Sequence, residues 1–173
     1  MTDKIYNVLF LCTGNSARSI LGEVLMNHDS MGRFRAFSAG SQPKGAVHPE
    51  ALRLLSGLGF DTAGLRSKSW EEFSGPDAPV FDFIFTVCDN AAGEACPAWP
   101  GHPITAHWGI EDPAAASPDQ QPEAFRQALR YLRRRIELFL ALPLDGLDRM
   151  AAERRLREIG RSEGATGTAG ALA

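Results

Sequence analysis

Residues 6–11, Tyr-Asn-Val-Leu-Phe-Leu, form a short apolar run that ends at Cys12. A run of this kind, with β-branched and aromatic side chains, is typical of a strand that is buried on both faces. The tetrapeptide Thr-Gly-Asn-Ser then breaks the pattern, and Ser16 is a candidate N-cap for a helix. The apolar face of that helix would consist of Ile20, Leu21, Val24 and Leu25. The chain is therefore predicted to begin with a strand, a tight loop and a helix.

The same alternation continues along the chain. Further strands are predicted at residues 35–38, 81–87 and 103–107, and helices at 49–58 and 125–139. The apolar stripe of the last helix consists of Phe125, Leu129, Leu132, Ile136 and Phe139. Four arginines of this helix are expected to be solvated, namely Arg130, Arg133, Arg134 and Arg135. Strands that alternate with helices indicate an α/β fold with a parallel, doubly wound sheet and right-handed crossovers.

The length of the chain predicts its domain organisation, and its net charge bears on the kinds of partner it can bind. The 173 residues suit one catalytic domain over residues 1–142, a helical extension over 143–160 and a disordered tail over 161–173. The net charge of -3 gives no indication of a basic surface for nucleic acid, and no apolar run is long enough to span a membrane. The N-terminus lacks the features of a secretory signal. We therefore expect a cytoplasmic protein, whose three cysteines serve catalysis or redox chemistry.

The segment from Cys12 to Arg18 reads Cys-Thr-Gly-Asn-Ser-Ala-Arg and carries the clearest chemical signal. A loop between a strand and a helix can point successive backbone N–H groups inward, which makes a nest for an anion. Gly14 and Asn15 tolerate the tight backbone angles of such a loop, and the guanidinium of Arg18 can hold two oxygens. The same positive surroundings lower the pKa of the Cys12 thiol. The segment therefore predicts a nucleophile in an oxyanion site.

Two further cysteines lie later in the chain. Cys88 follows a predicted strand, so it should reach the same sheet edge as Cys12, and Cys96 comes eight positions later. Both are candidates for thiol exchange with Cys12. Two alternatives remain: inert buried cysteines, or zinc ligands together with His102 and His107, although neither pair has the tight spacing of a structural zinc site.

Residues 8–19, together with Ser38-Ala39-Gly40 and Asp112-Pro113, resemble the low-molecular-weight protein tyrosine phosphatases, and within that group the arsenate reductases most closely. The resemblance extends over about residues 5 to 140 and implies a four-stranded parallel sheet flanked by helices. It also implies that arsenate, or a phosphate-like oxyanion, is bound by the segment after the nucleophile. The residues of that segment are Thr13, Gly14, Asn15, Ser16, Ala17, Arg18 and Ser19.

The similarity to the reductases implies a relay of thiols. Cys12 would attack arsenate while Asp112 protonates the departing oxygen, with Glu111 as the nearest rival for that role. Cys88 would then attack the Cys12 sulfur and release arsenite. Cys96 would take over the redox-active disulfide, which an external donor reduces. In this group the donor is thioredoxin, or glutathione with glutaredoxin, and the function is arsenic resistance.

The runner-up is a tyrosine phosphatase, which would use the same nucleophile, arginine and acid. Phosphatases of this group commonly have a tyrosine soon after the acid, whereas residues 114–116 here are all alanine. A third class, a non-catalytic oxyanion-binding or redox-sensing module, would need neither Asp112 nor Cys88. No bound cofactor is expected. Some relatives bind a potassium ion beside the loop, and the residues that match part of that site are Asn15, Glu23 and Ser38.

Overall fold

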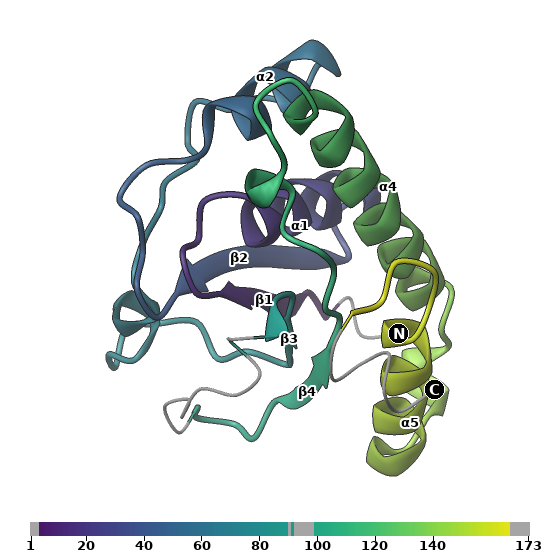
Figure 1. Cartoon of the computed structure of the whole chain (residues 1–173). Coiled ribbons are helices and arrows are strands. Elements are labelled where there is room, and N and C mark those ends of the chain that lie inside the picture. Colours follow the sequence, from purple (N-terminus) through teal and green to yellow (C-terminus); the bar gives the residue numbers. More distant parts are fainter. Residues whose placement is uncertain (1–3, 90, 92–98, 167–173) are drawn as a thin grey trace.

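The computed structural model describes residues 4–89, 91 and 99–166. These residues contain a four-stranded parallel sheet in the order β2-β1-β3-β4 (Figure 1). The strands are β1 (Tyr6–Cys12), β2 (Phe34–Gly40), β3 (Phe83–Thr86) and β4 (Ile104–His107). The predicted parallel α/β sheet flanked by helices is confirmed.

The helices lie around this sheet, with α1, α2 and α4 on one side and α5 beside β4 (Figure 1). Their bounds are α1 (Arg18–Asp29), α2 (Pro49–Gly57), α4 (Gln121–Leu140) and α5 (Arg149–Gly160). Three short 3-10 turns are η1 (Trp70–Phe73), η2 (Pro113–Ala115) and η3 (Leu144–Gly146). Within the described ranges, none of the helices has the length and apolar character needed to cross a membrane.

Strand β1 is buried on both faces, as its sequence predicted. Val8 and Phe10 belong to the large core cluster under α1 and α4. Leu9 points to the other face and joins a smaller cluster that contains Phe73 of η1 and Phe81. Because successive side chains of a strand alternate between faces, the continuous apolar run requires cover on both sides of the sheet.

Helix α4 matches its predicted apolar stripe, since all five stripe residues are buried. Arg135 differs from the expectation of a solvated side chain because it is fully buried. Its guanidinium donates to the backbone carbonyl oxygens of Glu163 at 3.1 Å and Ser162 at 3.2 Å, just after α5. Burial lowers the pKa of Arg135 to about 10, so the group remains charged at neutral pH. Arg135 therefore fastens the C-terminal segment to the core.

The C-terminal extension docks along β4. The indole N–H of buried Trp108 donates to the carbonyl oxygen of Leu156 in α5 at 3.0 Å. Residues 161–166, which we expected in a disordered tail, also lie on the core, where Ala165 forms an antiparallel bridge with Ile110. The remainder of the predicted tail lies outside the described residues.

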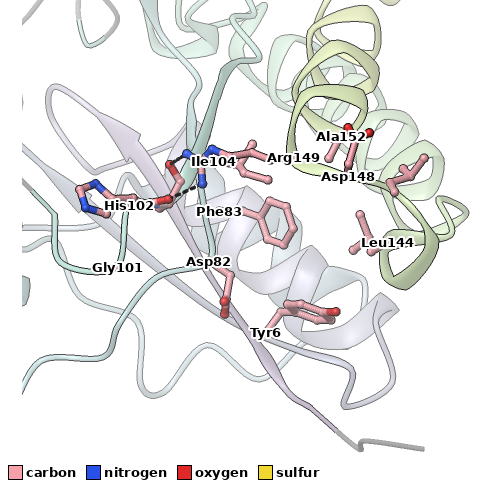
Figure 2. A pocket seen from close by; sticks show the side chains of 12 residues that line it. Tyr6, Asp82, Phe83, Gly101, His102, Ile104, Leu144, Asp148, Arg149 and Ala152 are labelled. Atoms are coloured by element: carbon pink, nitrogen blue, oxygen red, sulfur yellow. Dashed lines mark hydrogen bonds between the residues drawn. The ribbon is translucent and has the colours of Figure 1, made fainter.

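A pocket of about 290 Å³ lies at the amino ends of the strands, which is the edge opposite Cys12. Figure 2 shows the residues that line it. Its lining includes Tyr6, Asp82, Phe83, Ile104, Leu144 and Asp148. The Arg149 guanidinium beside it donates to the carbonyl oxygens of His102 at 2.7 Å and Pro103 at 3.2 Å. Parallel sheets bind ligands at the carboxyl edge, which is the other edge of this sheet. We therefore interpret this pocket as a gap in the packing between the C-terminal extension and the sheet.

Gly22 offers a test of the packing between α1 and β1. A Cβ atom at this position would lie 2.8 Å from the Phe10 ring, which is fully buried and packed near Phe85 and Trp108. Gly22→Ala is expected to lower the free energy of unfolding by about 1–3 kcal/mol, measured by urea denaturation. Gly57→Ala in α2 is the control, because a Cβ there meets nothing within 4 Å. If both variants lose the same free energy of unfolding, the contact with the Phe10 ring is not the cause of the loss.

Candidate active site

Cys12 is the last residue of β1, and Cys88 comes two residues after the neighbouring strand β3, at the same edge of the sheet. Cys12 pairs in register with Gly40 of β2, and on the other side the N–H of Val87 donates to the carbonyl oxygen of Leu11 at 2.9 Å. Neighbouring strands lie about 5 Å apart. This spacing suits a disulfide, whose Cα atoms are usually about 4.4–6.8 Å apart. Both cysteines are buried free thiols in the structure.

The loop between β1 and α1 is held from outside through its carbonyl groups. Three backbone N–H groups from residues 42–48 donate to the carbonyl oxygens of Thr13, Gly14 and Ser16 at 2.9, 3.0 and 2.9 Å. In a trans peptide the N–H points away from the preceding C=O. The N–H groups that follow these carbonyls therefore face the inside of the loop, as an anion nest requires.

Two positions allow the loop to take this shape. Asn15 is fully buried at a φ of 44°, in the left-handed region that asparagine tolerates. Its Oδ1 accepts from the N–H of Lys68 at 2.8 Å, and its Nδ2 donates to Ser19 Oγ at 2.8 Å. Gly40 lies so close to the loop that a Cβ atom would clash with the carbonyl oxygen of Thr13. Glycine is therefore required where β2 ends.

Arg18 is the first residue of α1, and Ala17 is the N-cap, so Ser16 does not cap the helix as predicted. One terminal nitrogen of Arg18 donates to the carbonyl oxygen of Ile110 at 2.9 Å, and the other lies 3.7 Å from Asp112 Oδ2. Its Nε is buried and has no hydrogen-bond partner among the described residues. A buried donor left without a partner is costly, so this N–H is suited to an oxygen of a bound anion.

Asp112 lies beside Arg18 at the rim of the loop. Its Oδ1 accepts from the N–H of Ala114 at 3.0 Å and so caps η2. The backbone of Asp112 is extended, as expected for a residue before Pro113. The side chain is 41% exposed, which leaves Oδ2 accessible to a ligand bound at Arg18. Glu111, the rival acid, is exposed.

The two buried thiols shift each other's pKa values in opposite directions. The interaction with Cys12 lowers the pKa of Cys88 to about 5, with help from the N–H of Ala91 at 3.4 Å and the hydroxyl of Thr13 at 3.7 Å. The same interaction and burial raise the pKa of Cys12, against the lowering effect of Arg18. The direction of the shift at Cys12 is therefore opposite to the one expected from the positive loop alone.

Cys96, the predicted third thiol, lies outside the described residues. The zinc alternative gains no support, because no three His, Cys, Asp or Glu side chains gather as metal ligands in the part of the chain that the structure describes. His107 Nε2 lies 2.8 Å from Asp89 Oδ1, and His102 lies beside the pocket at the opposite edge (Figure 2). The two histidines therefore do not lie together as the zinc alternative would require.

Glu23 and Ser38, which match part of the potassium site of relatives, contact Lys68. The Lys68 ammonium nitrogen is 3.7 Å from Glu23 Oε1 and 3.3 Å from Ser38 Oγ. Asn15, the third matching residue, uses its side-chain oxygen for the N–H of Lys68. The three residues, which match part of that site in sequence, do not fit a potassium ion here because the Lys68 side chain fills the place. Sequence reasoning missed Lys68, since a single lysine in a polar stretch carries no motif or periodic signal.

Comparison with known proteins agrees with this geometry. Residues 7–154 match the family of low molecular weight phosphotyrosine protein phosphatases. The arsenate reductase of Bacillus subtilis (strain 168) is 33% identical over 131 residues, which cover 75% of this chain and 89% of the relative.

Solved structures agree as well. The structure of an arsenate reductase in the phosphate-binding state is 29% identical, with a TM-score of 0.64, and the match covers 79% of this chain and 98% of that one. A thioredoxin-dependent arsenate reductase of Corynebacterium glutamicum, 24% identical with a TM-score of 0.54, shares the fold over 80% of this chain and 65% of its own. Because the family match covers most of the chain, including the loop and both strand-end cysteines, the chain belongs to the low molecular weight phosphotyrosine protein phosphatase family.

Proposed function

We propose that this protein reduces arsenate to arsenite and serves arsenic resistance, with Cys12 as the nucleophile and Cys88 as the resolving thiol. The observation that carries this proposal is the place of two buried thiols at one edge of the sheet, where Cys88 Sγ lies 3.7 Å from the hydroxyl of Thr13, the residue after Cys12. Hydrolysis of a thiol adduct needs one sulfur, whereas reduction needs a second sulfur within reach of the first. Relatives such as the Bacillus subtilis protein, named as an arsenate reductase, support the choice of substrate.

The first step forms a bond between sulfur and arsenic. Cys12 passes its proton to the neighbouring Cys88 thiolate, and the Cys12 thiolate attacks the arsenic atom. The loop amides over residues 13–19 and the guanidinium of Arg18 stabilise the negative oxygens. Asp112 protonates the departing oxygen, which leaves as water. The product is a covalent adduct of arsenate on Cys12.

The second step transfers the electrons. Cys88 loses its proton to solvent and attacks the Cys12 sulfur, so the bond between sulfur and arsenic breaks. Its electron pair stays on arsenic, which falls from As(V) to As(III) and leaves as arsenite, while the two sulfurs form a disulfide. Cys96 then attacks Cys88, which frees Cys12 and leaves a disulfide between Cys88 and Cys96.

An external thiol must reduce that disulfide. We propose thioredoxin as the donor, because a dithiol can reduce a protein disulfide without leaving a mixed adduct, with glutathione and glutaredoxin as the alternative. A relay of thiols needs a compartment that keeps cysteines reduced, which supports a cytoplasmic location.

Replacing Cys88 separates reduction from hydrolysis. The wild-type protein is expected to turn over arsenate when it is coupled to thioredoxin or to glutathione with glutaredoxin, as followed by NADPH consumption. Cys88→Ser is expected to abolish this turnover, because the adduct cannot be resolved. Hydrolysis of an aryl phosphate needs no second thiol and should persist in the variant. Cys96→Ser should still form the disulfide between Cys12 and Cys88 in a single turnover, but it should not recycle.

The same assays can reject the proposal. A wild-type protein that ignores arsenate but hydrolyses aryl phosphate, with Cys88→Ser unchanged, would be a phosphatase. A protein that binds phosphate and performs neither reaction would be an oxyanion-binding module.

Replacing Asp112 tests the proton donor. Asp112→Asn is expected to slow adduct formation by about 100-fold, because the departing oxygen would leave without a proton. Phosphate affinity should not fall, since the variant removes a negative charge beside Arg18. The exposed neighbour provides the control, and Glu111→Gln should leave both quantities unchanged. If only Glu111→Gln slows adduct formation, Glu111 is the proton donor and the assignment to Asp112 is wrong.

The pH titration of the thiols tests their pairing. In the wild-type protein the ultraviolet absorbance of one thiolate is expected to appear as the pH rises through about 5. In Cys12→Ala this transition should move up toward about 8.5, because the donor to Cys88 is gone. A lowered pKa adds stability that is fully present above about pH 8.5. That stability is lost as the pH falls through about 5. The free energy of unfolding of the wild-type protein, measured by urea denaturation, should therefore fall over this pH range. The fall should be smaller in Cys12→Ala. An unchanged titration in Cys12→Ala would contradict the effect of Cys12 on the pKa of Cys88.

A further inference from the structure

Lys68 is a buried charged residue for which the proposed chemistry has no use. The residue is 8% exposed. Its ammonium donates to the carbonyl oxygen of Arg66 at 2.9 Å and to Ser38 Oγ at 3.3 Å, and it lies 3.7 Å from Glu23 Oε1. A buried charge is costly unless it is paired, and an ammonium group has three N–H donors. The three contacts therefore form a complete site for this cation.

The backbone of Lys68 also joins the anion loop to the sheet. Its N–H donates to Asn15 Oδ1 at 2.8 Å, and its carbonyl oxygen accepts from the N–H of Gly40 at 2.9 Å. Asn15 in turn bonds Ser19 at the start of α1. These main-chain bonds do not depend on the side chain, so a substitution at Lys68 tests the effect of the ammonium group separately.

The carboxylate of Glu23 is the negative charge that the Lys68 ammonium neutralises. The Glu23 side chain is 16% exposed and accepts from the Ser38 hydroxyl at 2.8 Å, close to the place where the loop is anchored. A carboxylate in such a position is poorly screened by solvent and would repel an anion in the loop. A cation beside Glu23 removes that repulsion.

We propose that Lys68 is a built-in cation that neutralises Glu23 and keeps the anion loop able to bind an oxyanion, so that this chain needs no potassium ion there. An ammonium group carries the same charge as a potassium ion and is close to it in size. Because it is tethered to the chain, it stays in place at any salt concentration. Lys68 acts as a positioning residue, and its role does not depend on arsenate as the substrate, since inorganic phosphate also reports on the loop.

The test measures binding of inorganic phosphate by calorimetry and thermal unfolding, in potassium chloride and in choline chloride of equal ionic strength. The wild-type protein is expected to give the same results in both salts. Lys68→Met fills the space without charge and should weaken phosphate binding roughly five- to tenfold in both salts. Lys68→Ala leaves room for an ion, so its weak binding in choline chloride should recover in potassium chloride, together with a higher unfolding temperature.

Two controls separate charge from packing. Lys4→Met removes a lysine that is 54% exposed and paired with Asp82 at the opposite edge of the sheet, and it should change neither measurement. Lys68→Met combined with Glu23→Gln should bind phosphate nearly as well as the wild type, because no carboxylate is left to neutralise.

Three results would overturn the proposal: wild-type phosphate binding that rises specifically with potassium, full affinity in Lys68→Met, or a double variant as weak as Lys68→Met. If Lys68→Ala does not fold, Lys68→Met and the double variant still decide the question.

Discussion

The parallel pairing of β1 with both β2 and β3 is the constraint on which the site depends. On one side it sets Cys12 against Gly40, where the lack of a side chain lets the anion loop fold back over β2. On the other side it brings Cys88 to the same edge as Cys12. The loop and the second thiol are thus placed by backbone hydrogen bonds, which hold the sulfurs close before any substrate arrives.

Charges around this edge are arranged in opposed pairs. Arg18 lies beside Asp112, and Lys68 lies beside Glu23 of α1. Each pair is wholly or partly buried, where electrostatic interactions are stronger than in water. A tetrahedral anion can therefore enter a site whose donors are already oriented, which reduces the reorganisation that binding requires.

The C-terminal extension supports the site from a distance. Ala165 bridges Ile110, and the carbonyl oxygen of Ile110 is the one that orients Arg18. Thr166 lies 3.4 Å from the carboxylate of Asp89, the residue after Cys88. Buried Arg135 holds the segment that makes these contacts. The extension thus contacts Ile110, which orients Arg18, and Asp89, which follows Cys88.

The sequence by itself determined the sheet, the strand-end position of Cys12 and the anion loop, because these depend on local periodicity and on the residues that a tight turn tolerates. It also indicated Asp112 and Cys88, through the family pattern. Only the tertiary structure decided how the two thiols shift each other's pKa values, why Arg135 is buried and what Lys68 contacts. These properties arise from contacts between residues far apart in the chain, and such contacts leave no periodic or motif signal in one sequence.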